Sequence, residues 1–253
     1  MSSYILKRML QIIPVLLAIV TLNFFLIQMA PGDPAVVMAG PEAPAAYVEE
    51  VRRAYGLDRP VYEQYWNYLT HVVRGDLGMS LSFQRPVLDV LLERIPNTLL
   101  LVLTGFAWSS VLGTYLGAVA ARRRGTFVDA SLSVMALVLF SIPVFWLGLV
   151  FIIVFAVELQ WLPSSGLVSI RAPRDFLGNT LNRLEHLILP SLTLGLAYVG
   201  QYLRLARASI GEVMHEDFIT TYRGIGYDEG TIFSRFALRN ALLPVVTVAG
   251  LQI

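Results

Sequence analysis

The sequence predicts an all-α fold: a polytopic transmembrane helical bundle with four full spans, the start of a fifth, and a small external helical region. Two observations carry this prediction. Of the 253 residues, 56% are hydrophobic and only 15% are charged, whereas charged residues make up about a quarter of an ordinary soluble domain. The chain also contains several apolar runs of about 20 residues, the length that a helix needs to cross a bilayer.

Four apolar runs are long enough to span the membrane: Met9–Met29, Leu99–Ala120, Ala130–Val157 and about His186–Leu205. The first run exceeds the apolar part of a signal peptide and lacks a small-residue cleavage site at its end, so we expect a retained anchor. The third run is long enough to tilt or to bend at Pro143. The fourth is less apolar, because Gln201 and Arg204 fall near its end.

The distribution of Lys and Arg predicts the orientation, because these residues mark the cytoplasmic side of short loops. Lys7 and Arg8 place the N-terminus in the cytoplasm. The cluster Arg122–Arg124 follows the second span and falls on the same side, as two crossings require. Three arginines lie on the predicted outer side and conflict with this rule, namely Arg171, Arg174 and Arg183. We keep the topology despite this conflict.

This topology divides the chain into three parts. Residues 1–30 form the cytoplasmic N-terminus and the first span, and residues 31–97 form an external helical region. Residues 98–253 form a core with spans two to four, a polar cytoplasmic insert at 207–240 and a partial fifth span. A helix over residues 241–253 rises only about 20 Å, so we expect the chain to lack the rest of a fifth span and whatever followed it.

The external region contains two segments with the pattern of amphipathic helices, residues 44–56 and 59–73. The first has apolar residues at helical spacing and ends at Gly56, and the second begins with Pro60 and carries Tyr62, Tyr65 and Trp66. Two compatible interpretations remain open. The segments form a small helical cap packed on the membrane surface, or they form a docking surface for a soluble partner.

A stripe of small residues follows one face of the second span, with a spacing of four residues: Ser109, Gly113, Gly117 and Ala121. Such a stripe lets two helix backbones approach closely, which matters in lipid because hydrophobicity does not drive helix association there. We expect helix packing at this stripe. The pattern leaves open whether the neighbouring helix belongs to the same chain or to another subunit.

Several kinds of chemistry are excluded. The chain has no cysteine, and its three histidines, His71, His186 and His215, have no metal-ligand spacing. The sole lysine is Lys7, so a Walker A lysine is absent and any ATP must bind to another subunit. No acid lies within the four runs, which disfavours a carboxylate relay. The net charge of +1 gives no sign of nucleic-acid binding. We expect neither an enzyme nor a cofactor in this chain.

The polar insert ends in the stretch "GIGYDEGTIFSRFALRNALLP", residues 224–244. Asp228 is predicted to cap a helix, with Tyr227 packed on Ile232 as a hydrophobic staple. The preceding residues 211–223 are predicted to form one helix that is broken at Gly224 and Gly226. Two short helices joined at glycines and attached to spans would form a rigid lever on the cytoplasmic face. An ordinary solvated loop is the alternative.

Long stretches in a fixed order now identify a family. They include "YILKRMLQIIPVLLAIVTLNFFLIQMAPGDPA", "YGLDRPVYEQYWNYLTHVVRGDLGMSLSFQRPVLDVLLERIPNTLLL", "SIPVFWLGLVFIIVFAVELQWLPSSG" and "FALRNALLPVVTVAGLQ". The chain resembles the inner-membrane permease subunits of bacterial ABC importers, within the dipeptide, oligopeptide and nickel group, with a truncated C-terminus. The resemblance covers essentially the whole chain.

The resemblance implies ATP-driven import of di- or oligopeptides across the bacterial inner membrane. It implies a second permease subunit, two cytoplasmic ATP-binding subunits that hydrolyse ATP, and an external solute-binding protein. Import of nickel or a metal chelate is the alternative within transport. A truncated remnant that binds partner subunits without transporting is the alternative of another class.

The family's cytoplasmic signature, E-A-A-x-x-x-G followed later by Leu and Pro, has a partial match. Gly226 matches its glycine, and Leu243 and Pro244 match its end, whereas Thr220, Thr221 and Tyr222 replace Glu, Ala and Ala. The residues that the resemblance implies for coupling to the ATPases, within an insert at 212–244, are Asp217, Thr221, Arg223, Gly226, Arg239, Asn240 and Pro244.

Overall fold

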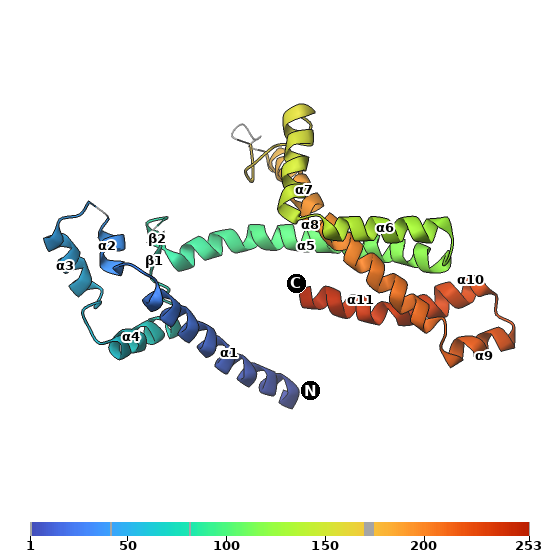
Figure 1. Ribbon diagram of the computed structural model, residues 1–253, viewed down its shortest axis with the longest axis horizontal. Coiled ribbons are helices and arrows are strands. Elements are labelled where there is room, and N and C mark those ends of the chain that lie inside the picture. The colour runs from blue at the N-terminus through green and yellow to red at the C-terminus, as the bar shows by residue number, and fades with distance from the viewer. Residues whose placement is uncertain (1, 41, 81, 170–174, 253) are drawn as a thin grey trace. The chain divides into compact units, whose positions relative to one another are not determined.

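The computed structural model describes residues 2–40, 42–80, 82–169 and 175–252, and these residues are mostly helical (Figure 1). The prediction of an all-α bundle is confirmed. The chain divides into two compact units, Met1–Ile95 and Pro96–Ile253. Arg171 and Arg174, which opposed the predicted topology, lie outside the described residues.

The first unit contains a long apolar helix followed by short ones. Helix α1 (Ser2–Met29) precedes α2 (Pro34–Ala39), α3 (Ala45–Ala54) and α4 (Val61–Val73). Strands β1 (Met79–Ser80) and β2 (Arg85–Pro86) then form a small antiparallel hairpin before α5 (Val87–Arg122) begins. The two predicted amphipathic segments appear as α3 and α4. Neither α2 nor the hairpin was predicted, because both are too short to show a hydrophobic period.

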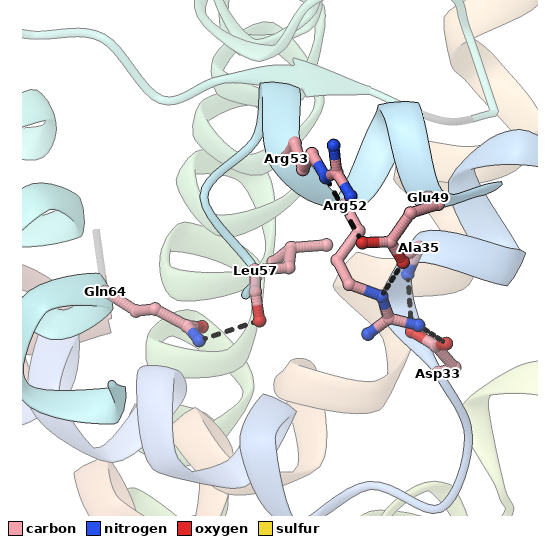
Figure 2. A network of polar contacts seen from close by, with 7 residues as sticks. All are labelled: Asp33, Ala35, Glu49, Arg52, Arg53, Leu57 and Gln64. Carbon is pink, nitrogen blue, oxygen red and sulfur yellow. Dashed lines mark hydrogen bonds and ion pairs between the residues drawn. The ribbon is translucent and has the colours of Figure 1, made fainter. Parts of the chain in front are cut away.

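A polar network joins α2 to α3 (Figure 2). Asp33 caps α2 by accepting the amide hydrogen of Ala35 over 2.9 Å, and the guanidinium of Arg52 donates to the same carboxylate. The Ala35 amide first, and then Arg52, hold the pKa of Asp33 below its usual value. Arg52 also lies 3.3 Å from Glu49 on its own helix. One arginine of α3 therefore orients the N-terminus of α2.

The second unit begins within α5, which starts well before the predicted boundary at Leu99 and continues through Pro96. Helix α6 (Phe127–Ser141) follows, and then α7 (Val144–Phe151) with the π-helical segment η1 (Ile152–Glu158). The axis bends by 95° between α6 and α7. Proline disfavours helical dihedral angles in the residue before it, and Ile142 is extended with ψ of 125°. The predicted bend at Pro143 is confirmed.

Helix α8 (Phe176–Val213) contains the predicted fourth span and extends beyond it at both ends. It is followed by α9 (Asp217–Ile225), α10 (Glu229–Thr231), the π-helical segment η2 (Ile232–Ala237) and α11 (Leu238–Gln252). The prediction of a single helix over residues 211–223 was wrong. The chain leaves helical geometry at Glu216, and this break lets Ile219 reach a buried cluster with Ile232.

Among the residues that the structure describes, three helical segments are long and apolar enough to cross a membrane: Leu6–Met29, Val87–Arg122 and Glu229–Gln252. The bent pair Phe127–Ser141 and Val144–Glu158 forms a fourth if it is one span. The apolar run after Pro244 is therefore the last part of the longer helical segment Glu229–Gln252. This segment begins within residues 207–240, which were predicted to form a polar insert. Helix α8 is not among these segments, and its many buried positions explain how it tolerates polar residues.

Candidate functional site

The candidate site is a helical hairpin made of α9, α10 and η2, here named the 217–237 hairpin. Ile219, Ile232 and Ala237 are fully buried between its two arms. Partly buried hydrophobic side chains pack around them, namely Val213, Met214, Tyr222 and Phe236. The two arms therefore share an apolar core, which a solvated loop would lack.

The turn of the hairpin depends on Gly226, which has φ of +97° and ψ of 18°. The Tyr227 amide donates to the carbonyl of Tyr222 over 3.1 Å, and the Gly226 amide donates to that of Arg223 over 3.0 Å. This is the glycine-ended helix termination in which a left-handed residue satisfies the last carbonyls. A side chain at this φ would strain the backbone, although the space around Gly226 is open.

Asp228 begins the second arm, as predicted. Its carboxylate accepts the Thr231 amide over 2.8 Å and the Thr231 hydroxyl over 2.7 Å. The hydroxyl first, and then the amide, hold the pKa of Asp228 below its usual value. The carboxylate is therefore ionised at neutral pH, and its charge lies at a helix N-terminus, where negative charge is favoured.

Aromatic rings close the hairpin on the side of the turn. The ring of Tyr222 stacks on that of Phe236, with centroids 3.9 Å apart and planes inclined by 14°. Tyr227 meets both rings edge-on, at 5.6 Å and 5.5 Å. The predicted staple between Tyr227 and Ile232 is replaced by these ring contacts, because Ile232 lies in the buried cluster of the hairpin.

An ion pair crosses the turn. The guanidinium of Arg223 donates to both carboxylate oxygens of Glu229, over 2.6 Å and 3.3 Å. Glu229 raises the pKa of Arg223 through this hydrogen bond. Both side chains are substantially exposed, so we expect the pair to fix geometry more than to add stability.

Helix α11, which continues directly from the hairpin, is bound to α8. The buried hydroxyl of Ser209 donates to the carbonyl of Ala241 over 3.0 Å. Tyr202, Ala206 and Val245 form a buried apolar cluster between the two helices. At the far end of α11, the Tyr202 hydroxyl donates to Gln252 over 2.7 Å. The hairpin is therefore connected to α8 both by the chain and through α11.

Helix α8 is in turn bound to α6 by two arginines. Arg207 donates to both oxygens of the buried carboxylate of Asp129, over 2.5 Å and 2.9 Å. The Gly125 amide donates to the same carboxylate over 3.0 Å. One turn away, the guanidinium of Arg204 lies 4.2 Å above the ring of Phe140, a cation–π contact.

The small-residue stripe of α5 faces α8 of the same chain. A Cβ atom on Gly113 would lie 2.6 Å from Cβ of Tyr202, and one on Gly117 would lie 2.6 Å from the carbonyl oxygen of Leu203. Ser109 is fully buried and its hydroxyl donates to the Phe106 carbonyl. Ala121 is half-buried at the end of the stripe. The two helix backbones are close enough to require glycine at both positions.

The seven residues that the resemblance implied for coupling fall into two groups. Asp217, Thr221, Arg223 and Gly226 lie on α9 or end it, and Arg239, Asn240 and Pro244 lie on α11. All seven are exposed. The Thr221 hydroxyl donates to the Asp217 carbonyl, and the Asn240 amide donates to the Phe236 carbonyl. Each of these two polar side chains therefore bonds to a backbone carbonyl near it in the sequence and, among the described residues, to no residue distant in the sequence.

The three histidines make the same local contact: His71 in α4, His186 in α8 and His215 in the turn directly after α8. Each ring Nδ1 lies next to the backbone carbonyl four residues earlier, over 2.7 Å for His71, 2.8 Å for His186 and 2.6 Å for His215. Across residues 2–40, 42–80, 82–169 and 175–252, no group of three or more acids and histidines is placed to hold a metal ion.

The contacts that connect the 217–237 hairpin to the other helices, through Ser209 and Asp129, were not predicted from the sequence. Asp129 is the sole acid between Leu99 and Val157, and this isolation was a usable signal, because a lone carboxylate at the edge of an apolar helix needs a partner. No comparable signal marks Ser209 or the stack of Tyr222 on Phe236, since both depend on residues distant in the sequence.

Comparison with known proteins identifies two matching family models. The first describes the "Binding-protein-dependent transport system inner membrane component" and matches residues 113–253. The second describes the N-terminal part of such membrane components and matches residues 1–102. Together they cover nearly the whole chain.

Curated relatives agree with these models. The glutathione transport system permease proteins GsiC of Escherichia coli strain K12 and strain CFT073 are each 41% identical over 252 residues. The GsiC protein of Shigella boydii serotype 4 is 40% identical. Each alignment covers 100% of this chain and 78% of the relative.

Proposed function

The chain belongs to the family of binding-protein-dependent transport system inner membrane components, and we propose that it forms half of the path for ATP-driven import of di- or oligopeptides, with glutathione as the first candidate. The names of the curated relatives support this substrate, because each is called a glutathione transport permease. The family is one of transport permeases, and hydrolysis of ATP is assigned to separate cytoplasmic subunits.

The proposed assembly contains a second permease subunit, two cytoplasmic ATP-binding subunits and an external solute-binding protein. In this assembly the N-terminus and the 217–237 hairpin face the cytoplasm of the bacterial cell. Two groups of basic residues support this orientation. Lys7 and Arg8 lie in the first turns of α1, and the exposed arginines Arg122–Arg124 lie at the end of α5 and directly after it.

One observation carries the proposed mechanism: the hairpin has its own core and is tied to α8 through α11. ATP binding closes the ATPases, and their movement displaces the exposed surface of α9 and the start of α11. Because the arms are packed together, the displacement passes through Ala241 to Ser209 and so to α8. The ion pair between Arg207 and Asp129 carries it on to α6. The path between the two permeases then opens alternately to each side.

Uptake by the complete transporter tests this proposal. Vesicles containing this chain, its partner permease, the ATPases and the solute-binding protein would receive radiolabelled glutathione, with ATP supplied to the ATPases. We expect accumulation that requires both ATP and this chain.

Vesicles lacking only this chain are the matched control. Failure to accumulate glutathione or any of a panel of di- and tetrapeptides would contradict the proposed substrate class. Accumulation of radioactive nickel in their place would favour the metal-chelate alternative. If the solute-binding protein and ATPases associate with the chain but nothing is transported, the non-transporting alternative is favoured.

A further inference from the structure

Helix α4 has three distinct faces. At about 100° per residue, Gln64, Tyr65 and Tyr68 share a first face. A second face carries large apolar side chains within about 60° of one another: Tyr62, Trp66, Leu69 and Val73. The third face is polar and is formed by Glu63, Asn67, Thr70 and His71.

The first face binds the C-terminal part of α1, beside which α4 lies in Figure 1. The hydroxyl groups of Thr21 and Tyr65 share a hydrogen bond of 2.8 Å. The side chain of Gln28 donates to that of Gln64 over 2.8 Å. The ring of Phe24 lies between these bonds and packs against Tyr65 at 5.3 Å and Tyr68 at 5.7 Å.

The amide of Gln64 also fixes the start of α4. Its nitrogen donates to the carbonyl of Leu57 over 3.2 Å, drawn in Figure 2, and to that of Arg59 over 2.7 Å. The oxygen of the same Gln64 amide accepts the hydrogen bond from Gln28, so both polar atoms of this side chain are hydrogen-bonded. The position of α4 on α1 is therefore set by directed bonds as well as by ring packing.

These contacts fix the depth of α4 in the membrane. In the apolar span Leu6–Met29, only 6% of the most apolar stretch is buried, so the surroundings of α1 must be lipid or other membrane helices. The contacts with α4 occupy residues 21–28, which is about 10 Å of helix at the C-terminal end of the span. Lipid headgroups begin at this level of a membrane helix.

Within the first unit, most of the second face of α4 is uncovered at this depth. Tyr62 is 72% exposed, Trp66 is 64% exposed and Val73 is 79% exposed. The apolar face lies beside the face that binds α1, and the polar face lies on the other side of it. Tyrosine and tryptophan are the side chains that concentrate at the boundary between lipid and water, because each has a large apolar ring and one polar group.

We propose that α4 is an interfacial helix, with Tyr62, Trp66, Leu69 and Val73 inserted into the headgroup layer of the bilayer at the C-terminal end of α1. The occupant of this face is lipid, because the face lies at headgroup level beside a span whose most apolar stretch is only 6% buried, and it carries the Tyr and Trp side chains that concentrate at that level. A helix with this division of faces lies in the membrane plane. In the proposed topology this end of α1 lies at the outer leaflet, and only that choice of leaflet rests on the proposed function.

Site-directed spin labelling tests the proposal directly, since the chain has no cysteine. Single variants Trp66→Cys and Asn67→Cys form a matched pair of neighbours on different faces. Each is labelled with a nitroxide in the complete transporter, in vesicles of phosphatidylcholine and phosphatidylglycerol. Collisions with oxygen, which concentrates in lipid, are compared with collisions with a water-soluble nickel chelate. Tyr62→Cys and Glu63→Cys repeat the comparison one turn earlier.

We expect the ratio of oxygen to nickel collisions to be several-fold higher at positions 62 and 66 than at positions 63 and 67. Equal ratios on the two faces would overturn the proposal, because both faces would then lie in the same environment and α4 would not lie at the boundary between lipid and water. Low collision rates with both reagents at positions 62 and 66 would also overturn it and would indicate a protein partner on this face. Glutathione uptake by the same vesicles is a separate readout, so loss of transport and loss of lipid contact are distinguishable.

Discussion

Replacing Gly113 with leucine is expected to force α5 away from α8 and to lower the free energy of unfolding by about 3 kcal/mol, the upper end of the cost of overpacking a core. A single Cβ atom at this position would already lie 2.6 Å from Cβ of Tyr202 and 2.7 Å from the carbonyl oxygen of Val199. Two of the obstructing atoms belong to α8 close to its backbone, so a rotamer change cannot relieve the clash. Gly113→Ala should show a smaller effect in the same direction.

Titration with a denaturing detergent, monitored by circular dichroism, would measure this change. Ala107→Leu on the same helix is the matched control, because Ala107 is exposed and the added side chain meets the surroundings of the bundle. We expect the control to stay within about 0.5 kcal/mol of the unmodified chain. If Gly113→Leu were as stable as Ala107→Leu, the close contact of α5 with α8 would be wrong.

Replacing Arg207 with methionine is expected to destabilise the chain by about 2 to 3 kcal/mol. Removing one partner of a fully buried ion pair typically costs 3 to 5 kcal/mol, because the remaining charge stays buried without compensation. Asp129 has 7% of its side chain exposed, but Arg207 has 39% exposed, so water can partly replace the guanidinium. The Gly125 amide would remain as a donor to the carboxylate.

A double variant distinguishes the stability lost with the ion pair from the stability lost with the packing of the Arg207 side chain. Asp129→Leu combined with Arg207→Met replaces both charges by apolar groups, and we expect it to recover most of the stability lost in Arg207→Met. Arg123→Met is the surface control, since Arg123 is exposed. Detergent titration gives the free energy of unfolding of the unmodified chain, of Arg207→Met, of the double variant and of Arg123→Met. A double variant no more stable than Arg207→Met would show that the ion pair is not the reason for the loss.

The parts of the fold that were predictable are those set by local physics. Hydropathy located α1, α5 and the bent pair around Pro143, because a bilayer requires uninterrupted apolar helices. Helical periodicity located α3 and α4. The cap at Asp228 was predictable because a short acidic side chain before a helix bonds to the first free amides.

The remaining features depend on contacts between distant residues. Helix α8 is buried by its neighbours, so its apolar pattern is weak, and its length exceeds what hydropathy indicated. The break at Glu216 follows from burial of Ile219 against Ile232, which are brought together by the hairpin turn. Within the candidate site, the break at Gly226 was predicted from the sequence and its role in coupling was implied by the family resemblance, whereas the contacts of Asp129 and Ser209 became visible only with the tertiary structure.

The rigidity of the hairpin is central to the proposed coupling, and two neighbouring glycines allow it to be tested. Gly226→Ala places a side chain at φ of +97°, a strain of about 1 to 2 kcal/mol that should loosen the turn and the pair of Arg223 with Glu229. Gly224→Ala lies inside α9 with open space around its Cβ position, and it should strengthen the helix by about 0.5 to 1 kcal/mol.

The most direct measurement is the number of glutathione molecules imported per ATP hydrolysed by the complete transporter carrying each variant. A rigid hairpin that transmits ATPase movement predicts a lower ratio for Gly226→Ala, with ATP hydrolysis retained, and an unchanged or higher ratio for Gly224→Ala. Equal ratios in the two variants and the unmodified transporter would contradict coupling through the 217–237 hairpin.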